Sequence, residues 1–326
     1  TTTVGTVSLW KKDGKDVWQH PMIRCDVYAV DLSAWEKPGR YRLVIDGVGC
    51  SADFAIGPRR YRDPFLVSTR GFFYMRIGQD SMDLVPVPRR PFYRPGQDPV
   101  GFTVVKTTMH PYRPEWQGGG DRWAQPDFFA RFVQEGRPEN PQAWGGHSDA
   151  ADWDRHLGHV SIIYDLLLPY VLCPGLLDDD GLGIAESGNG IPDVIDEARY
   201  EVDFWLRLRD GAGYSHGLTN AKDNLMYQAG ATPIAAWANA ANAGMLARAF
   251  QMAERPDLMA TYRDAAVEAY RHAAAQEAHW LDALHGVGNT TYRGRDLKFL
   301  AAACLFEVTG AAEWEDAVLD ESVVDA

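Results

Sequence analysis

The densest group of reactive side chains lies in residues 144–156, which read Trp-Gly-Gly-His-Ser-Asp-Ala-Ala-Asp-Trp-Asp-Arg-His. Asp149 and Asp152 are three residues apart, so both carboxylates project the same way in a turn or in the first turn of a helix. Two neighbouring carboxylates can hold and polarise one water molecule, which base-assisted hydrolysis requires. The spacing also suits a structural role, in which Asp152 or Asp154 caps a helix and Asp149 forms an Asx turn.

Aromatic rings and histidines surround this acidic pair. The faces of Trp and Tyr can cover the apolar side of a pyranose, and Trp144 and Trp153 are the rings nearest to the pair in the sequence. His147, His156 and His159 are candidate zinc ligands, the last two at His-x-x-His spacing. No HExxH-type motif accompanies them, so metal-dependent hydrolysis is the weaker interpretation.

The composition limits the partners of the protein. The chain has 326 residues and a net charge of −13, which argues against a nucleic acid or an anionic membrane, since either needs a cationic surface. No apolar run approaches the roughly 20 residues of a membrane span. Residues 1–5 show no feature of a signal peptide, and the four cysteines form no CxxC pair, so neither a disulfide framework nor a thiolate zinc site is expected.

Short β-strands are expected in the first part of the chain. The turn signals Asp13-Gly14 and Asp46-Gly47 separate alternating segments, and the first of them predicts a hairpin. The expected strands are 7–10, 16–20, 39–46 and 51–56. A complete β-sandwich of this kind needs about seven strands over roughly 100 residues, so the sequence predicts a shortened one.

A helical pattern begins beyond residue 150, after an irregular stretch, 62–145, that is rich in proline, glycine and aromatic residues. Long irregular segments inside compact domains usually carry functional surface. The expected helices are 154–173, 192–210, 233–253, 258–279, 296–308 and one from 312 onward. The alanine-rich helix 233–253 allows close approach of its neighbours, as a layered helical barrel or bundle needs.

Four motifs, in order, resemble glycoside hydrolase family 9, the cellulase-type inverting enzymes with an N-terminal immunoglobulin-like domain. Residues 145–152 resemble the family's Gly-Gly-x-x-Asp-Ala-Gly-Asp signature, with Ala151 in place of a glycine, and residues 186–198 match a second signature almost letter for letter. Residues 71–76 resemble the aromatic–arginine strip at the start of the catalytic domain. Residues 38–43 resemble a strand of the immunoglobulin-like module.

The resemblance implies a mostly α-helical protein with two modules. An immunoglobulin-like β-sandwich, shortened, is expected at 1–60. The N-terminal portion of an (α/α)6-barrel glycosidase domain is expected at 61–326, and this barrel is incomplete because it needs twelve helices and about six are expected before Ala326. The resemblance also favours a secreted or periplasmic protein.

The resemblance assigns Asp152 as the general base and Asp149 as the residue that helps to hold the attacking water. The expected sugar contacts are Trp144, Trp153, Arg155 and His156. Inversion needs a separate acid about 6.5–9.5 Å from the base. In the family this acid is a glutamate near the C-terminus of the domain; nothing around Glu321 resembles its motif, so the acid is assigned to no residue of this chain.

The leading hypothesis is therefore inverting hydrolysis of a β-linked glucan or oligosaccharide, by a cellulase, exo-glucosidase or glucosaminidase-like enzyme. The alternative is a non-catalytic carbohydrate-binding protein, or an inactive fragment that lacks the acid. The chemistry needs no cofactor and no metal ligand is assigned, although the resemblance is compatible with a structural calcium. The oxygen-rich turn around residues 178–193 is interpreted as a solvated acidic turn.

Overall fold

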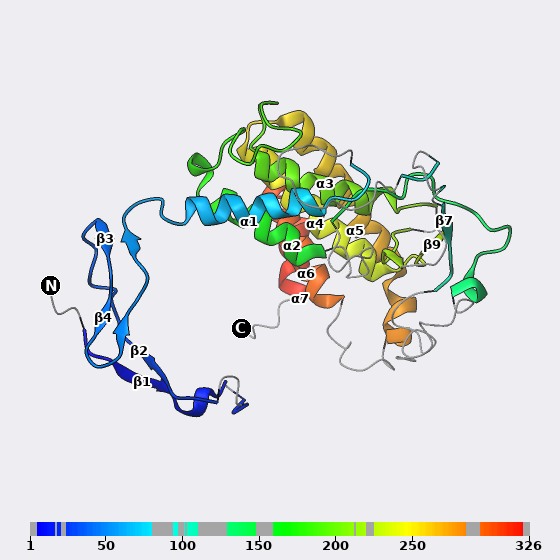
Figure 1. The fold of residues 1–326 in the computed structure, drawn as a ribbon. Helices are drawn as coiled ribbons and strands as arrows, with labels where there is room; N and C mark the ends of the chain where they lie inside the picture. The colour runs from blue at the N-terminus through cyan, green and yellow to red at the C-terminus, as the bar shows by residue number, and fades with distance from the viewer. Residues whose placement is uncertain are drawn as a thin grey trace. The chain divides into compact units, whose positions relative to one another are not determined.

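The computed structural model describes residues 5–16, 18–20, 24–79, 94–96, 101, 103–109, 129–147, 159–211, 213–219, 225–284 and 294–321. The chain divides into two compact units, Thr1–Phe65 and Leu66–Ala326. Strands make up most of the regular structure of the first unit, and helices dominate the second (Figure 1). The expected module limits, 1–60 and 61–326, stay predictions.

The first unit consists of short antiparallel pairs in the part that the structure describes. The pairs are β1 (Ser8–Lys11) with β2 (Val27–Ala29), β3 (Gly39–Tyr41) with β6 (Phe54–Ile56), and β4 (Val44–Ile45) with β5 (Gly49–Cys50). The single strand expected over 39–46 is thus two strands.

The predicted hairpin between 7–10 and 16–20 was wrong. The partner of β1 is β2, and Asp13, at φ 57°, lies in a 3-10 turn, Lys12–Gly14. The carboxylate of Asp16 accepts hydrogen bonds from the backbone N–H groups of Trp18 and His20, at 2.9 and 2.8 Å. Such a local side-chain bond offers the backbone an alternative to strand pairing.

Seven α-helices appear among the described residues. They are α1 (Arg62–Met75), α2 (Val160–Leu172), α3 (Asp193–Arg207), α4 (Pro233–Met252), α5 (Pro256–Leu284), α6 (Arg295–Thr309) and α7 (Ala312–Glu321). The six helices from α2 to α7 confirm the sequence-based predictions to within a few residues, apart from the start of α2 and the end of α5, which extends five residues beyond the expected one. Helix α1 was not expected, so the prediction of irregular chain from residue 62 was wrong there.

Helix α4 forms the centre of the helical unit and packs against α2, α3, α5 and α6. Its start is fixed by Pro233 and by the side chain of Thr232, which accepts a hydrogen bond from the N–H of Ala235 at 3.2 Å. Its small side chains let neighbouring helices approach closely. At Gly244, for example, an added Cβ would lie 2.8 Å from the Cβ of Cys304 on α6. None of the described helices is long and apolar enough to cross a membrane.

A small mixed sheet lies at one edge of the helical unit (Figure 1). It contains β7 (Thr103–Lys106), β9 (Leu225–Gln228) and β8 (Leu218–Thr219). Strand β7 runs parallel to β9, and β8 runs antiparallel to β9. The sequence did not predict this sheet, because its strands are short and come from distant parts of the chain.

Candidate functional site

The structure describes the chain up to His147 and again from His159. Five of the predicted site residues, Asp149, Asp152, Trp153, Arg155 and His156, lie outside the described residues. Their assigned roles therefore stay predictions. The structure describes the residues that flank this segment in the sequence, up to His147 and from His159 onward.

His147 is buried and contacts two carboxylates of α3. Its Nε2 lies 2.6 Å from Oε1 of Glu197, and its Nδ1 lies 2.6 Å from Oε2 of Glu201. The backbone N–H of His147 donates to the same Oε2 atom, also at 2.6 Å. Glu197 and Glu201 are four residues apart, so α3 presents both on one face.

These contacts require a protonated His147. A neutral imidazole has one N–H, so its other nitrogen would direct a lone pair at a carboxylate oxygen at hydrogen-bonding distance. Burial opposes the charged ring, but hydrogen bonds to Glu197 and Glu201 and the charges of both outweigh it and raise the pKa of His147 above its ordinary value. Burial raises the pKa of each glutamate, but it is outweighed at Glu197 by the charge of Arg76 and by His147, and at Glu201 by His147 and His159, so that both pKa values are lowered.

Arg76 supplies the second buried cation. Its guanidinium donates to both oxygens of Glu197, at 2.9 and 3.0 Å, and to Oε1 of Glu186 at 2.9 Å. The side chains of Arg76 and Glu197 are fully buried. Because a buried charge needs a partner, the two cations Arg76 and His147 balance the two buried carboxylates Glu197 and Glu201.

Three of the sequence motifs therefore meet in one ion network. Arg76 ends motif 71–76, His147 lies in motif 145–152, and Glu186 and Glu197 lie in motif 186–198. An antiparallel backbone bridge also joins Arg76 to His147, and the N–H of Ile77 donates to the carbonyl of Gly146 at 2.9 Å. The motifs were found separately in the sequence, and the structure shows that a described residue of each belongs to one ion network.

Gly146 is required by close packing beside this network. It has φ 75°, and a Cβ added to it would lie 2.6 Å from the ring of Phe204 on α3. Gly188 has a comparable φ of 87°, but nothing lies within 4 Å of the Cβ position there. A side chain at Gly188 would therefore introduce backbone strain alone, whereas a side chain at Gly146 would introduce both backbone strain and steric overlap.

We expect Gly146→Ala to destabilise the protein more than Gly188→Ala. Both replacements introduce a side chain in the left-handed region, at a cost of about 1–2 kcal/mol. Only Gly146→Ala adds overpacking, which costs about 1–3 kcal/mol more. Urea unfolding of the two variants measures the difference, and equal losses would contradict the packing role of Gly146.

No family model matches the chain. Endoglucanase D of Acetivibrio thermocellus is 26% identical over 190 residues, which are 57% of this chain and 26% of that protein. A metagenome-derived glycoside hydrolase family 9 endoglucanase is 25% identical, with a TM-score of 0.64 over 90% of this chain and 52% of the solved one. The family 9 endoglucanase J30 has a TM-score of 0.65 at 21% identity, over 97% of this chain and 56% of the solved one.

The fold is similar to that of solved glycoside hydrolase family 9 endoglucanases, and the sequence is similar to that of Endoglucanase D. The expectation of a mostly α-helical, incomplete (α/α)6 barrel with a small sheet domain is confirmed. The chain spans 26% of the length of Endoglucanase D and about half the length of the solved family 9 chains.

Trp144 is the one predicted sugar-contact residue that the structure describes. The guanidinium carbons of Arg94 and Arg207 lie 3.8 and 4.0 Å from its ring centroid. Both cations therefore lie within the range of a cation–π interaction with this ring. The predicted contact of Trp144 with a sugar stays a prediction.

The acidic turn before α3 is more buried than the sequence suggested. Asp193 is 1% exposed, and its Oδ2 accepts hydrogen bonds from the N–H of Leu182 at 2.8 Å and from Ser187 Oγ at 2.9 Å. The interpretation as a solvated turn was therefore wrong for Asp193. Among the described residues, no group of three or more His, Cys, Asp and Glu side chains could hold a metal ion. The structural calcium with which the resemblance is compatible stays a prediction.

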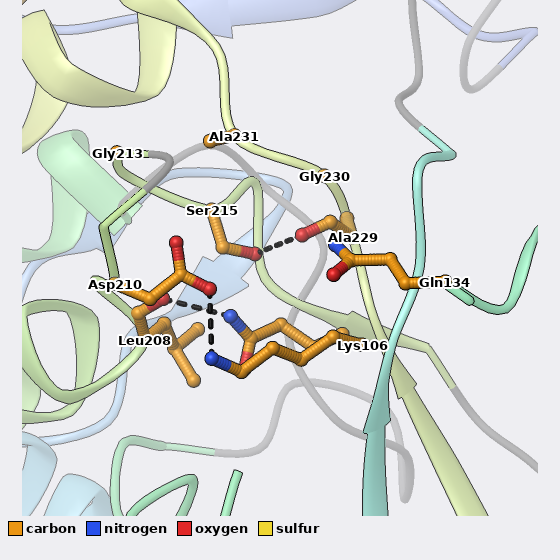
Figure 2. Close-up of a pocket in the computed structure, with 10 residues that line it drawn as sticks. Lys106, Gln134, Leu208, Asp210, Gly213, Ser215, Ala229, Gly230 and Ala231 are labelled. Atoms are coloured by element: carbon orange, nitrogen blue, oxygen red, sulfur yellow. Dashed lines mark hydrogen bonds and ion pairs between the residues drawn. The ribbon is translucent and has the colours of Figure 1, made fainter. Parts of the chain in front are cut away.

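Figure 2 shows a small cavity beside β7 and β9. Lys106 Nζ lies 2.8 Å from Asp210 Oδ2 at its wall, and Ser215 Oγ donates to the carbonyl of Ala229 at 2.7 Å. Its volume of about 10 Å³ accommodates one water molecule. This cavity is too small for a sugar and is not a substrate site.

Proposed function

We propose that the protein hydrolyses β-linked glucan with inversion at the anomeric carbon. Asp152 acts as the general base, and Asp149 helps to hold the attacking water. The observation that carries this proposal is the single buried ion network in which three family 9 motifs meet, directly before the segment that carries both aspartates. The relatives support the class of reaction, since they are named as endoglucanases.

In this mechanism Asp152 is ionised, accepts a proton from water and generates the nucleophile at the anomeric carbon. A carboxylic acid on the other side of the glycosidic bond protonates the leaving oxygen, at about 6.5–9.5 Å from the base. The proposal assigns this acid to none of residues 1–326. The net charge of −13 favours a neutral or cationic sugar over a uronic-acid polymer.

The stereochemistry of the first product tests the proposal. The natural full-length polypeptide is incubated with cello-oligosaccharides, with chitosan oligosaccharides in parallel, and the anomer formed first is followed by ¹H NMR. Inversion of a β-linkage releases the α-anomer first. Early release of the β-anomer would contradict the mechanism, and saturable binding without hydrolysis would favour the non-catalytic carbohydrate-binding alternative.

A further inference from the structure

Glu201 contacts the chain on both sides of segment 148–158, at the last described residue before it and the first one after it. His147 reaches Oε2 through its backbone N–H and through Nδ1, each at 2.6 Å. The Nδ1 of His159 lies 2.9 Å from the other oxygen, Oε1. One carboxylate therefore contacts two residues that are twelve positions apart in the sequence.

The geometry around Glu201 is fixed from several sides. Its carboxylate is fully buried, and its Oε1 also accepts a hydrogen bond from Trp205 Nε1, one turn along α3, at 2.7 Å. The rings of His159 and Trp205 meet edge to face at 6.2 Å. These contacts leave Glu201 little rotamer freedom, so its two oxygens are preorganised acceptors.

His159 starts α2 in a conformation that needs support. It is the N-cap residue, with φ 46° and ψ 36°, and its side chain makes no capping hydrogen bond. A non-glycine residue in the left-handed region costs about 1–2 kcal/mol. Strained backbone of this kind persists where surrounding contacts hold it in place. The contact of His159 with Glu201 is one such contact.

We propose that Glu201 is a positioning residue for hydrolysis: it fixes His147 and His159, the two described residues between which the sequence carries Asp149 and Asp152. The inference rests on the proposed function, because it gives these two aspartates their catalytic roles. Fixing two points of a chain lowers the conformational freedom of the residues between them. Catalytic groups must be held to within a fraction of an ångström, since a misplacement of about 1 Å can cost 10²-fold in rate.

The ion pairs of His147 with Glu197 and Glu201 depend on pH. Among the residues that the structure describes, the groups that face its ring are Glu197, Glu201 and Tyr200 on α3, with Arg76 behind Glu197 and the ring of Phe72 on α1. Burial raises the pKa of Tyr200 to about 12, so it stays neutral. The pKa of His147 is raised from 6.5, so its contribution to stability is complete below pH 6.5 and is lost as the pH rises through the folded-state pKa.

The test is Glu201→Gln in the natural full-length polypeptide. A glutamine oxygen can still accept from His159 and Trp205, but its NH₂ group faces the two donors of His147. We expect kcat on cello-oligosaccharides to fall about 10²-fold with little change in KM. The alkaline limb of the pH–kcat profile should move to lower pH, because His147 loses one of its carboxylates. Glu268→Gln is the matched control, since Glu268 is exposed on α5, and it should retain wild-type kcat.

Histidine ¹H–¹⁵N NMR provides a readout that needs no activity. Wild-type His147 should show two slowly exchanging, strongly hydrogen-bonded ring protons, and Glu201→Gln should remove the Nδ1 signal. Wild-type spectra without these signals would overturn the proposed contacts between Glu201 and His147. A wild-type protein that shows them without hydrolysing any glucan would instead overturn the proposed function.

A second pair of variants keeps the proposal falsifiable if Glu201→Gln fails to fold. An asparagine amide can replace Nδ1 of His159 and tolerates positive φ, whereas alanine does neither. His159→Asn should therefore retain most of kcat, and His159→Ala should lose about 10²-fold. Equal kcat for the two variants would overturn the positioning role.

Discussion

Asp152→Asn should lower kcat on β-linked glucan by about 10²- to 10⁴-fold, the contribution that general acid–base catalysis typically makes. The amide has nearly the shape of the carboxylate but cannot accept a proton from the attacking water. Substrate binding should change little, because Asp152 acts on the water rather than on the sugar. Steady-state kinetics of the natural full-length polypeptide measure both constants.

The choice of asparagine separates catalysis from helix capping. Asn and Asp are equally good N-cap residues, so a structural Asp152 would tolerate this substitution with little loss of stability or activity. A large loss of kcat with unchanged urea unfolding therefore identifies the base. Asp165→Asn is the matched control, because Asp165 is exposed on α2, and its kcat should equal that of the wild type.

Chemical rescue gives an independent check on the role of Asp152. Azide is already an anion and needs no base to attack the anomeric carbon, so it should restore part of the turnover of Asp152→Ala. The product of an inverting attack on a β-linkage is the α-glycosyl azide. Near-normal turnover of Asp152→Asn, or a β-glycosyl azide from Asp152→Ala, would contradict the assignment.

The helices after residue 159 could be predicted because their signals are local. Apolar periodicity and alanine content marked α4, and Ile191-Pro192-Asp193 marked the start of α3. Helix α1 lacks such a pattern: its aromatic end is stabilised by packing, with buried Phe73 against Leu182 and Ile184. Tertiary packing supplies most helix stability in proteins, and the sequence of α1 does not show its partners.

The buried network was not predicted because its partners are distant in the sequence. Arg76 and Glu197 are separated by 121 residues, and His147 and Glu197 by 50. One signal was present: Glu197 and Glu201 fall on the apolar stripe of α3 among Val194, Ala198 and Trp205. Charged residues at core positions of a helix indicate a buried ion pair, but the sequence of α3 alone does not identify the cation.

Arg76→Met should destabilise the protein by about 3–5 kcal/mol, the usual cost of removing one partner of a buried ion pair. Methionine fills much of the space of the arginine side chain but leaves Glu197 with His147 as its remaining cation. Glu186, whose side chain is 32% exposed, can regain water, so most of the loss should arise at Glu197. Urea unfolding measures the loss.

Arg209→Met is the matched control, because it removes the same side chain from an exposed ion pair with Glu268 and should cost no more than about 1 kcal/mol. The double variant Arg76→Met, Glu197→Gln tests the cause of the loss. If the loss comes from an uncompensated buried carboxylate, neutralising Glu197 should make the double variant less unstable than the sum of the two single changes. Additive losses would mean that Arg76 stabilises the protein by packing, and that the three motifs are not held together by charge.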